Sequence, residues 1–328
     1  MNRREAIRGL LATLVISPGG LLNLAHGQTR VLRVAALTGN SENSVARALA
    51  TFREELKALG YVEGRNLTLP ITYGVFSRES TRQLAAEAIA QKPDILFAMH
   101  GGLPALASLT KTIPIVGVFS GDMVEAGVVK SMARPGGNVT GVQLLQHDLV
   151  GKRIEILKEI VPSIKRLAVF AMAAHPGVAL EREVSVAAAK RLGISIAYFP
   201  LNKPEDLETG LLAAKAERVN GLVLFPDPIT LSGAPRIVAF ALQHKLPVVS
   251  GWDNYAYAGG LVSYGPNLRE AWRRAASYID RVAKGADPAT MPVEFPTIFE
   301  LVVNLKTAKE LGIKIPQSVL VRADSVIE

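Results

Sequence analysis

The chain has 328 residues, of which 49% are apolar and 20% are charged, and 37 Lys and Arg against 29 Asp and Glu leave a net charge of +8. At roughly 150 residues per domain this length predicts two domains or one large α/β unit, and the apolar content is too high for a disordered chain. The sequence contains no cysteine, which excludes disulfides, thiolate metal sites, iron–sulfur clusters and a cysteine nucleophile. The small charge excess indicates a solvated surface rather than a nucleic-acid groove.

The first 27 residues are typical of a cleavable export signal. A charged start with Arg3 and Arg4 is followed by the apolar run Leu10–Ile16, and the small residues Ala25 and Gly27 end the segment. The apolar run is too short and too broken to span a membrane. We therefore predict cleavage after Gly27 and a mature protein in the periplasm, with a buried first helix as the alternative. The arginine pair leaves both Sec and twin-arginine export open.

Beyond this segment, strand-like and helix-like stretches alternate. Val31–Leu37 is a compact apolar run, as in a strand covered on both faces, and Asn43–Leu59 has apolar residues at helical spacing before Gly60. Further strands are predicted at 66–72, 94–98, 113–119, 139–143, 166–171, 194–199, 221–225 and 247–250. Further helices are predicted at 79–90, 103–109, 147–160, 179–191, 204–216 and 233–243. These two runs of βα units predict an α/β fold with two doubly wound, parallel-sheet lobes.

Two glycine-bounded extended segments, at 139–143 and 259–266, predict that the chain crosses between the lobes more than once and forms a hinge. A helix at 268–283, with Trp272 on its apolar side, and a strand followed by a helix at 299–311 complete the chain. We expect residues 28–141 and about 266–285 to form the first lobe. Residues 142–265 and about 286–328 are then expected to form the second lobe, with a ligand cleft between facing strand ends.

Three motifs carry a family resemblance. They are Ala-Arg-Pro-Gly-Gly-Asn-Val-Thr-Gly at 133–141, Gly-Gly-Leu-Val-Ser-Tyr-Gly at 259–265, and the tail at 292–308, which begins Pro-Val-Glu-Phe-Pro-Thr. Together they resemble the ABC-transporter substrate-binding proteins whose best-known members are similar to tryptophan-binding proteins. The resemblance covers nearly the whole chain and implies a Venus flytrap of the periplasmic-binding-protein type I, ribose-binding kind, with three inter-lobe crossings. It also implies an exported component of an ABC importer, with an inner-membrane permease as partner.

Polar residues at the strand ends of the first lobe are candidate ligand contacts. Asn40, Ser41 and Asn43 follow the first strand and open the first helix, whose N-terminus favours a carboxylate; simple N-capping is the alternative. His100 and Gly101 follow the third strand, where glycine lets backbone amides approach a ligand. His100 is equally well explained as a rim residue bonded to the backbone.

Ser120 and Asp122 follow the strand at 113–119. The resemblance implies Ser-Asp-Pro-Val at this place, whereas this chain has an inserted Gly121 and has Met123 instead of proline. We expect Asp122 to bind a ligand amino group, in a loop whose backbone path differs from that of the family.

In the second lobe, His175, Asp227, Trp252 and Asp253 follow predicted strands and are further candidate ligand contacts. The resemblance implies that Asp227 occupies the acidic position of a Thr-Asp-Asn-type loop. The ring of Trp252 can stack on a planar or cationic ligand, and packing against the neighbouring helix is the alternative.

No nucleophile elbow, phosphate loop, dinucleotide motif or zinc-protease motif occurs in the sequence. We therefore predict a binding protein without catalytic residues, cofactor or metal, and we expect a monomer. One alternative is a two-lobed hydrolase that uses Asp122 and Asp227 as cleft carboxylates. Another is a protein that passes its ligand to a membrane sensor. Arg269, Arg273 and Arg274 are explained as a solvated helix face, because an exported chain does not regulate DNA.

The predicted mechanism is capture of a small molecule by hinge closure. We expect an amino-acid-like or aromatic zwitterion, with the loop at 38–44 binding its carboxylate and Asp122 or Asp227 binding its amine. A neutral or anionic small molecule is the alternative.

Overall fold

The computed structural model describes residues 31–39, 42–74, 78–99, 101–144, 146–175 and 177–328. The predicted export signal and three candidate ligand contacts, Asn40, Ser41 and His100, lie outside the described residues. Residues 31–328 form one compact unit. Among the helices in the described ranges, none combines the length and the apolar character that crossing a membrane requires.

The first sheet is parallel throughout and has the order β2-β1-β4-β5-β6, with β3 also paired to β1. Its strands are β1 (Leu32–Leu37), β2 (Leu67–Thr68), β3 (Ile71–Thr72), β4 (Ile95–Met99), β5 (Ile115–Phe119) and β6 (Val139–Gln143). The helices α1 (Glu42–Ala58), α2 (Arg78–Ala90), α3 (Gly102–Leu109) and α10 (Leu268–Ala283) pack around it. The strand predicted at 66–72 is split into β2 and β3 at Pro70, which has no N–H to donate.

Three buried aromatic rings join α1, β4 and α10. The ring of Phe52 stacks on that of Phe97 with centroids 4.6 Å apart, and Trp272 meets both rings edge-on at 5.7 and 5.5 Å. Trp272 therefore lies on the apolar side of its helix, as predicted. This cluster attaches α10 to the first sheet, although more than a hundred residues separate the helix from β6 in the sequence.

The second sheet has the order β13-β12-β11-β10-β9-β7-β8 and is parallel except between β11 and β12. Its strands are β7 (Arg166–Met172), β8 (Ser195–Leu201), β9 (Leu222–Leu224), β10 (Val248–Ser250), β11 (Val262–Pro266), β12 (Phe299–Asn304) and β13 (Ser325–Ile327). The longer helices of this lobe are α4 (Gln146–Ile160), α5 (Val178–Arg191), α6 (Asp206–Ala216), α8 (Ala234–Gln243) and α11 (Leu305–Leu311). Three short helices were not predicted: α7 (Pro228–Ser232), α9 (Asp253–Tyr257) and α12 (Gln317–Leu320). The predicted α/β class with two mainly parallel sheets is confirmed.

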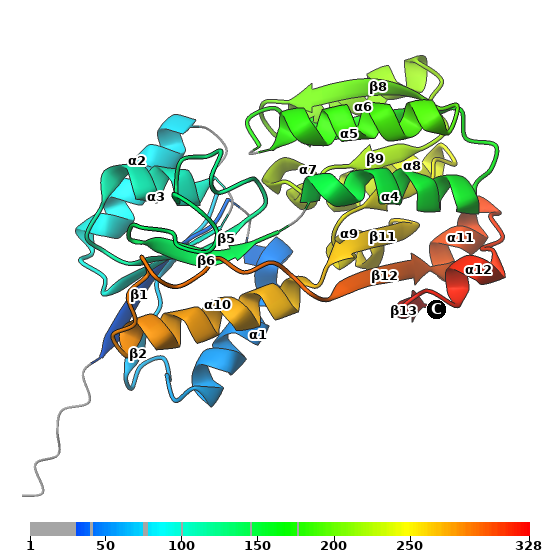
Figure 1. Ribbon diagram of the computed structural model, residues 1–328. Helices are drawn as coiled ribbons and strands as arrows, with labels where there is room; N and C mark the ends of the chain where they lie inside the picture. Colours follow the sequence, from blue (N-terminus) through cyan, green and yellow to red (C-terminus); the bar gives the residue numbers. More distant parts are fainter. Residues whose placement is uncertain (1–30, 40–41, 75–77, 100, 145, 176) are drawn as a thin grey trace, which may run out of the picture. The chain divides into compact units, whose positions relative to one another are not determined.

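The chain passes between the sheets three times (Figure 1). It leaves the first sheet after β6, returns after β11 to form α10, and reaches the second sheet again at β12. On this last passage Val293 N bonds to Met132 O at 2.7 Å, and Glu294 N bonds to Gly141 O at 2.9 Å. Residues 293 and 294 therefore lie against β6 and the loop that precedes it.

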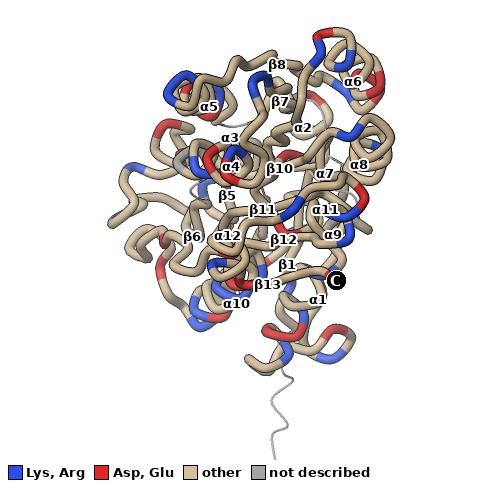
Figure 2. Tube along the Cα trace, turned by 90° about the vertical axis from the view of Figure 1, so that its right-hand side faces the viewer, with Lys and Arg blue, Asp and Glu red and all other residues tan. Residues whose placement is uncertain are grey.

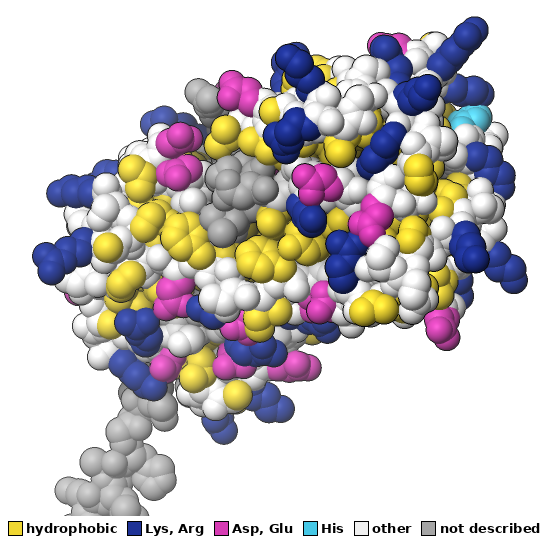
Figure 3. Space-filling model, turned by 45° about the vertical axis from the view of Figure 1, so that its right-hand side comes forward, with side chains coloured by type: hydrophobic (Ala, Val, Ile, Leu, Met, Phe, Trp, Pro, Cys, Tyr) yellow, Lys and Arg dark blue, Asp and Glu magenta, His cyan; other side chains and the backbone are white. Residues whose placement is uncertain are grey.

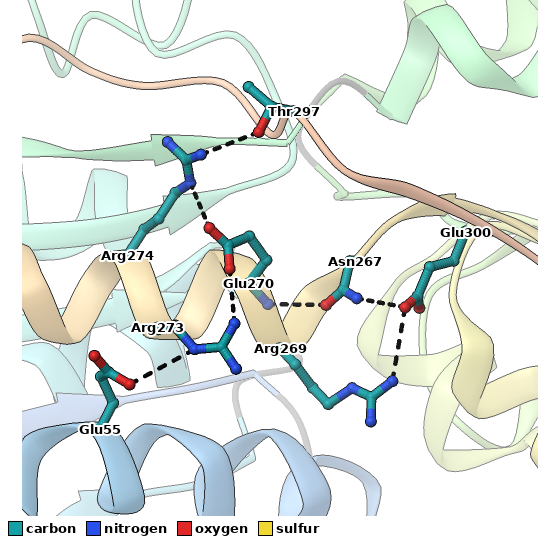
Figure 4. A network of polar contacts seen from close by, with 8 residues as sticks. All are labelled: Glu55, Asn267, Arg269, Glu270, Arg273, Arg274, Thr297 and Glu300. Carbon is teal, nitrogen blue, oxygen red and sulfur yellow. Dashed lines mark hydrogen bonds and ion pairs between the residues drawn. The ribbon is translucent and has the colours of Figure 1, made fainter. Parts of the chain in front are cut away.

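Polar contacts around the N-terminus of α10 bind the crossing segments together (Figure 4). Asn267 caps the helix, since its Oδ1 accepts from Glu270 N at 2.8 Å while its Nδ2 donates to Glu300 at the start of β12. Glu270 in turn accepts from Arg273 Nη1 at 2.8 Å and from Arg274 Nε at 3.1 Å. The cap thus connects the end of one crossing to the start of another.

The three arginines predicted to form a solvated helix face also make specific contacts outside α10. Arg269 pairs with Glu300, Arg273 with Glu55 of α1, and Arg274 with Thr297 of the last crossing (Figure 4). Elsewhere, basic and acidic residues are interspersed over the helices and loops (Figure 2). Arg269 and Arg274 are therefore part of the connection between the lobes, whereas Arg273 joins α10 to α1 around the first sheet.

Two glycines in the crossing strands let neighbouring backbones approach closely. A Cβ on Gly141 would lie 2.0 Å from Gly117 O of β5, and a Cβ on Gly265 would lie 1.7 Å from Gly251 O after β10. No side chain fits at either distance. Gly141 also has a φ of 139°, which residues with a side chain rarely adopt.

We predict that Gly141→Ala destabilises the protein by about 3 kcal/mol, because β6 must move away from β5 to accommodate the methyl group. Gly137→Ala is the matched control, since a Cβ there meets nothing within 4 Å, and its effect should stay within about 0.5 kcal/mol. Urea denaturation of the purified variants measures both values. Equal stabilities would contradict the close approach of the two strands.

Candidate functional site

The carboxyl ends of adjacent strands place the candidate side chains at the edge of each sheet. Ser120 follows β5 in the first sheet, and Asp227 and Trp252 follow the neighbouring strands β9 and β10 in the second. His175 lies in the loop after β7, which pairs with β9. Because parallel strands end at a common edge, residues far apart in the sequence come together there.

Ser120 and His175 connect the two lobes directly. Ser120 Oγ lies 3.0 Å from His175 Nε2, and both residues are buried. Next to them the backbones approach closely, since a Cβ on Gly177 would lie 3.6 Å from Gly121 Cα. The structure therefore brings together two of the residues selected from the sequence.

A second contact between the lobes involves Asp253. Its Oδ2 lies 3.5 Å from Arg47 Nη1 of α1, and the Arg47 guanidinium lies 4.1 Å from the centre of the Tyr257 ring. Arg47 was not selected from the sequence, where it is one of many cations on helix surfaces. Asp253 thus acts as an ion-pair partner across the lobes in this structure.

Asp122 folds back on its own loop. Its Oδ1 accepts from Val124 N at 2.7 Å and from Glu125 N at 2.9 Å. Asn43 is exposed in the first turn of α1, and Gly101 is the N-cap residue of α3, with open space where a Cβ would be. A ligand role for these three residues stays a prediction.

Asp227 is fully buried and holds two strand ends together. Its Oδ2 accepts from Met172 N at the end of β7 at 2.7 Å, and its Oδ1 accepts from Thr230 N at 2.8 Å to cap α7. Burial raises the pKa of the Asp227 carboxyl to about 6, although the backbone donors act in the opposite direction. Both carboxylate oxygens are therefore already engaged by backbone groups.

Trp252 is buried at the N-cap of α9, one turn before the buried Tyr255. The Tyr255 hydroxyl lies 2.7 Å from Thr230 Oγ1, so α9 is tied to the Asp227 cap. The ring of Trp252 belongs to one of the apolar core clusters of the protein. On the face shown in Figure 3, apolar side chains form a band across the middle, with charged residues around it.

Arg153 of α4 is a buried cation that was not predicted from the sequence. It has 0% exposure, and its Nε donates to Tyr264 O of β11 at 2.8 Å. Its guanidinium lies against Gly251, where a Cβ would be only 2.5 Å from Nη2. Burial lowers the pKa of Arg153 to about 10, so it remains charged at neutral pH.

Glu181, in the first turn of α5, is the second buried ion that was missed. It is 1% exposed, and neither carboxylate oxygen has a hydrogen-bond partner among the described residues. Burial raises the pKa of Glu181 to about 8; Arg153 lowers it and Asp227 raises it further. The helical pattern held a signal, because Glu181 shares its buried face with Ser185, Ala188 and Ala189.

The buried charged and hydrogen-bonding side chains at the carboxyl ends of the strands can recognise a polar ligand. Within the described part of the chain, no group of three or more His, Asp or Glu side chains is placed to hold a metal ion. The carboxylate pair of the hydrolase alternative also finds no support, because Asp122 caps its own loop and Asp227 holds backbone groups.

Comparisons with known proteins show which sequences this chain resembles. Residues 33–327 match the family model described as ABC transporter substrate binding protein. The tyrosine-binding protein of Clostridioides difficile (strain R20291) is 22% identical over 272 residues, which are 83% of this chain and 78% of that protein.

Two solved structures share the fold over 90% of this chain and all of their own. A conserved domain protein from Vibrio cholerae superposes with a TM-score of 0.84 at 28% identity. An ABC domain from Streptococcus pneumoniae in complex with L-Trp has a TM-score of 0.82 at 24% identity. The fold is that of type I periplasmic binding proteins of the ribose-binding type.

We predict that Asp227→Asn destabilises the unliganded protein by about 1–3 kcal/mol, because an amide can accept only one of the two backbone bonds and presents a donor to the other N–H. Asp122→Asn is the matched control, since Asp122 accepts both of its bonds through one oxygen, which asparagine retains. Thermal unfolding measures the difference. Equal losses in the two variants would contradict the bracing role of Asp227.

The stability of the unliganded protein should fall as pH rises from 5 to 8. The folded state holds protons on Glu181 up to a pKa of about 8 and on Asp227 up to about 6, whereas the unfolded chain releases them near 4.5 and 3.8. One retained proton corresponds to a slope of about −1.4 kcal/mol per pH unit at most. The groups facing Glu181 are Arg153, Asp227 and Tyr198, and His175 lies in the loop before its helix.

Glu181→Gln should remove the slope between pH 6 and 8 and leave the Asp227 contribution below pH 6. Thermal unfolding across this range is the measurement. His175→Gln serves as the control for imidazole titration, and a slope that survives in Glu181→Gln but disappears in His175→Gln would assign the effect to the histidine instead.

Proposed function

The chain belongs to the ABC transporter substrate-binding proteins, and on that premise we propose that it is the exported solute-binding component of an importer. It captures a small amino-acid-like or aromatic molecule between its lobes and delivers it to a membrane permease. The contact between Ser120 and His175 carries this proposal, because it joins polar groups from the strand ends of both lobes. After removal of residues 1–27, the protein acts in the periplasm as a monomer and without catalysis.

The proposed lobes follow the crossings of the chain. The first lobe comprises residues up to about 141 and the segment from about 266 to 297, and the second comprises the rest. Ligand closes the hinge between them to the extent that it binds the closed state more tightly than the open one. The contacts from Arg47 to Asp253 and from Ser120 to His175 would form on closure and break on opening.

An amino-acid-like ligand is supported by two kinds of observation. The relatives named above include a tyrosine-binding protein and a domain in complex with L-Trp. In this chain, buried acidic and basic groups, Glu181 and Arg153, lie at the same strand-end region and can interact with the two charges of a zwitterion.

We expect L-tyrosine or L-tryptophan to raise the unfolding temperature of the chain by several degrees, since a hundredfold excess over Kd adds about 2.7 kcal/mol of stability. A thermal-shift panel of amino acids, aromatic carboxylates, sugars and nucleosides measures this response, and small-angle scattering should show a smaller radius of gyration with the responsive ligand. A response to sugars or nucleosides alone would contradict the ligand class, and no response to any small molecule in the panel would contradict the solute-binding role.

A further inference from the structure

The buried carboxylate of Glu181 is left without the contacts that such a group requires. Neither oxygen accepts a hydrogen bond from any described residue, although the side chain is almost completely excluded from water. The other buried acidic side chains are bonded: Asp227 accepts from two backbone N–H groups, and Asp280 accepts from the Tyr61 hydroxyl and from Lys284 Nζ. An unpaired buried charge is strongly unfavourable, so Glu181 needs a partner that these residues do not supply.

The position of Glu181 points to the region where the lobes meet. It lies one turn into α5, and its N–H bonds to Gly177 O in the loop that carries His175. That loop contacts Ser120 of the other lobe. Helix α5 packs against α4 about two turns after Glu181, where a Cβ on Gly151 of α4 would lie 3.4 Å from the Cβ of Ala188. The backbone of Glu181 therefore lies near the strand-end edge, one turn from the loop that contacts the other lobe, and its side chain lies on the buried face of α5.

The charges in this region do not balance. Two buried charges act on Glu181: Arg153 from α4 attracts its carboxylate, and Asp227 after β9 repels it. One positive charge is missing when both acids are ionised. A metal ion does not fit, because the described residues place no cluster of three ligands there. A compact organic cation with N–H donors meets both requirements, since it supplies the charge and the hydrogen bonds.

We propose that Glu181 is a ligand-binding residue that pairs with the ammonium group of the captured molecule. The inference rests on the proposed function and deepens it, because it assigns the amine to Glu181 instead of Asp122 or Asp227. Asp227 uses both carboxylate oxygens for backbone donors, and Asp122 caps its own loop through Oδ1, whereas both oxygens of Glu181 are buried and accept no hydrogen bond from the described residues.

The raised pKa of Glu181 explains how the unliganded protein can bury this carboxyl group without a hydrogen-bond partner among the described residues. With a pKa raised to about 8 by burial, Glu181 holds a proton at neutral pH, and the proton neutralises it. A bound ammonium group then replaces the proton. Binding of an amine at pH 7 therefore releases a proton from the protein.

Matched amine and non-amine probes test the proposal by isothermal titration. The amines are L-tryptophan, L-tyrosine, tryptamine and tyramine, and the counterparts without an amino group are indolepropionate and phloretate. Glu181→Gln should weaken binding of the amines at least tenfold and should not weaken binding of the two acids. Glu183→Gln is the control, because Glu183 is an exposed residue of the same helix, and it should bind every probe like the parent.

A second measurement needs no variant and so does not depend on folding of Glu181→Gln. Titrations of the parent chain with an amine at pH 7, in buffers of different ionisation enthalpy, should show release of between half a proton and one proton per molecule bound. Release should be absent with indolepropionate and phloretate.

The outcomes separate this inference from the proposed function. Amino acids that bind the parent and Glu181→Gln equally would overturn the role of Glu181 and leave the solute-binding function standing. Tryptamine or tyramine binding that depends on Glu181, without binding of amino acids, would support the inference and overturn the amino-acid ligand class. Failure of every amine to bind the parent would overturn the inference.

Discussion

The connection between the lobes depends on how closely the crossing segments pack against the strands beside them. Gly141 and Gly265 place their backbones within contact distance of carbonyl oxygens in the neighbouring strands, so no side chain can separate them. Around this packing, the Asn267 cap and the arginines of α10 bind the second crossing to the third. In the proposed closure, the backbone angles at the ends of the crossings would change, because the strands packed at these glycines leave no space between them.

This anchoring fixes which groups meet at the strand ends. Because β5, β7, β9 and β10 all end at the edges from which the lobes touch, Ser120, His175 and Asp227 lie in one region although they come from three parts of the chain. Asp227 accepts from one strand-end N–H group, that of Met172 in β7, and from Thr230 N in the first turn of α7. The same burial that makes such braces effective also raises the pKa values of both carboxyl groups, and the pKa of Glu181 rises far enough for it to keep its proton at neutral pH.

A solute-binding protein has to hold its ligand tightly and still release it. Polar groups that are buried on closure serve this purpose, because each unpaired group penalises a closed state without the correct ligand. Protonation of Glu181 lessens this penalty in the unliganded state, and an ion pair replaces the proton when an amine is bound. Selectivity for an amine then depends on the difference in free energy between Glu181 with a proton and Glu181 paired with an ammonium group. The charges of Arg153 and Asp227 influence this difference.

The sequence by itself determined the fold class, most of the longer elements and the family, because apolar periodicity and glycine punctuation are local properties of the chain. It missed β13 and the short helices α7, α9 and α12, which are three to five residues long and therefore too short for a periodic pattern; α7 in addition depends on the Asp227 cap. It did lead to Ser120, His175 and Asp227, since strand ends can be read from the pattern. Only the tertiary structure decided what each polar group bonds to. Asp227 binds backbone N–H groups, Arg47 pairs across the lobes, and Glu181 and Arg153 are buried, because these outcomes depend on contacts between elements distant in sequence.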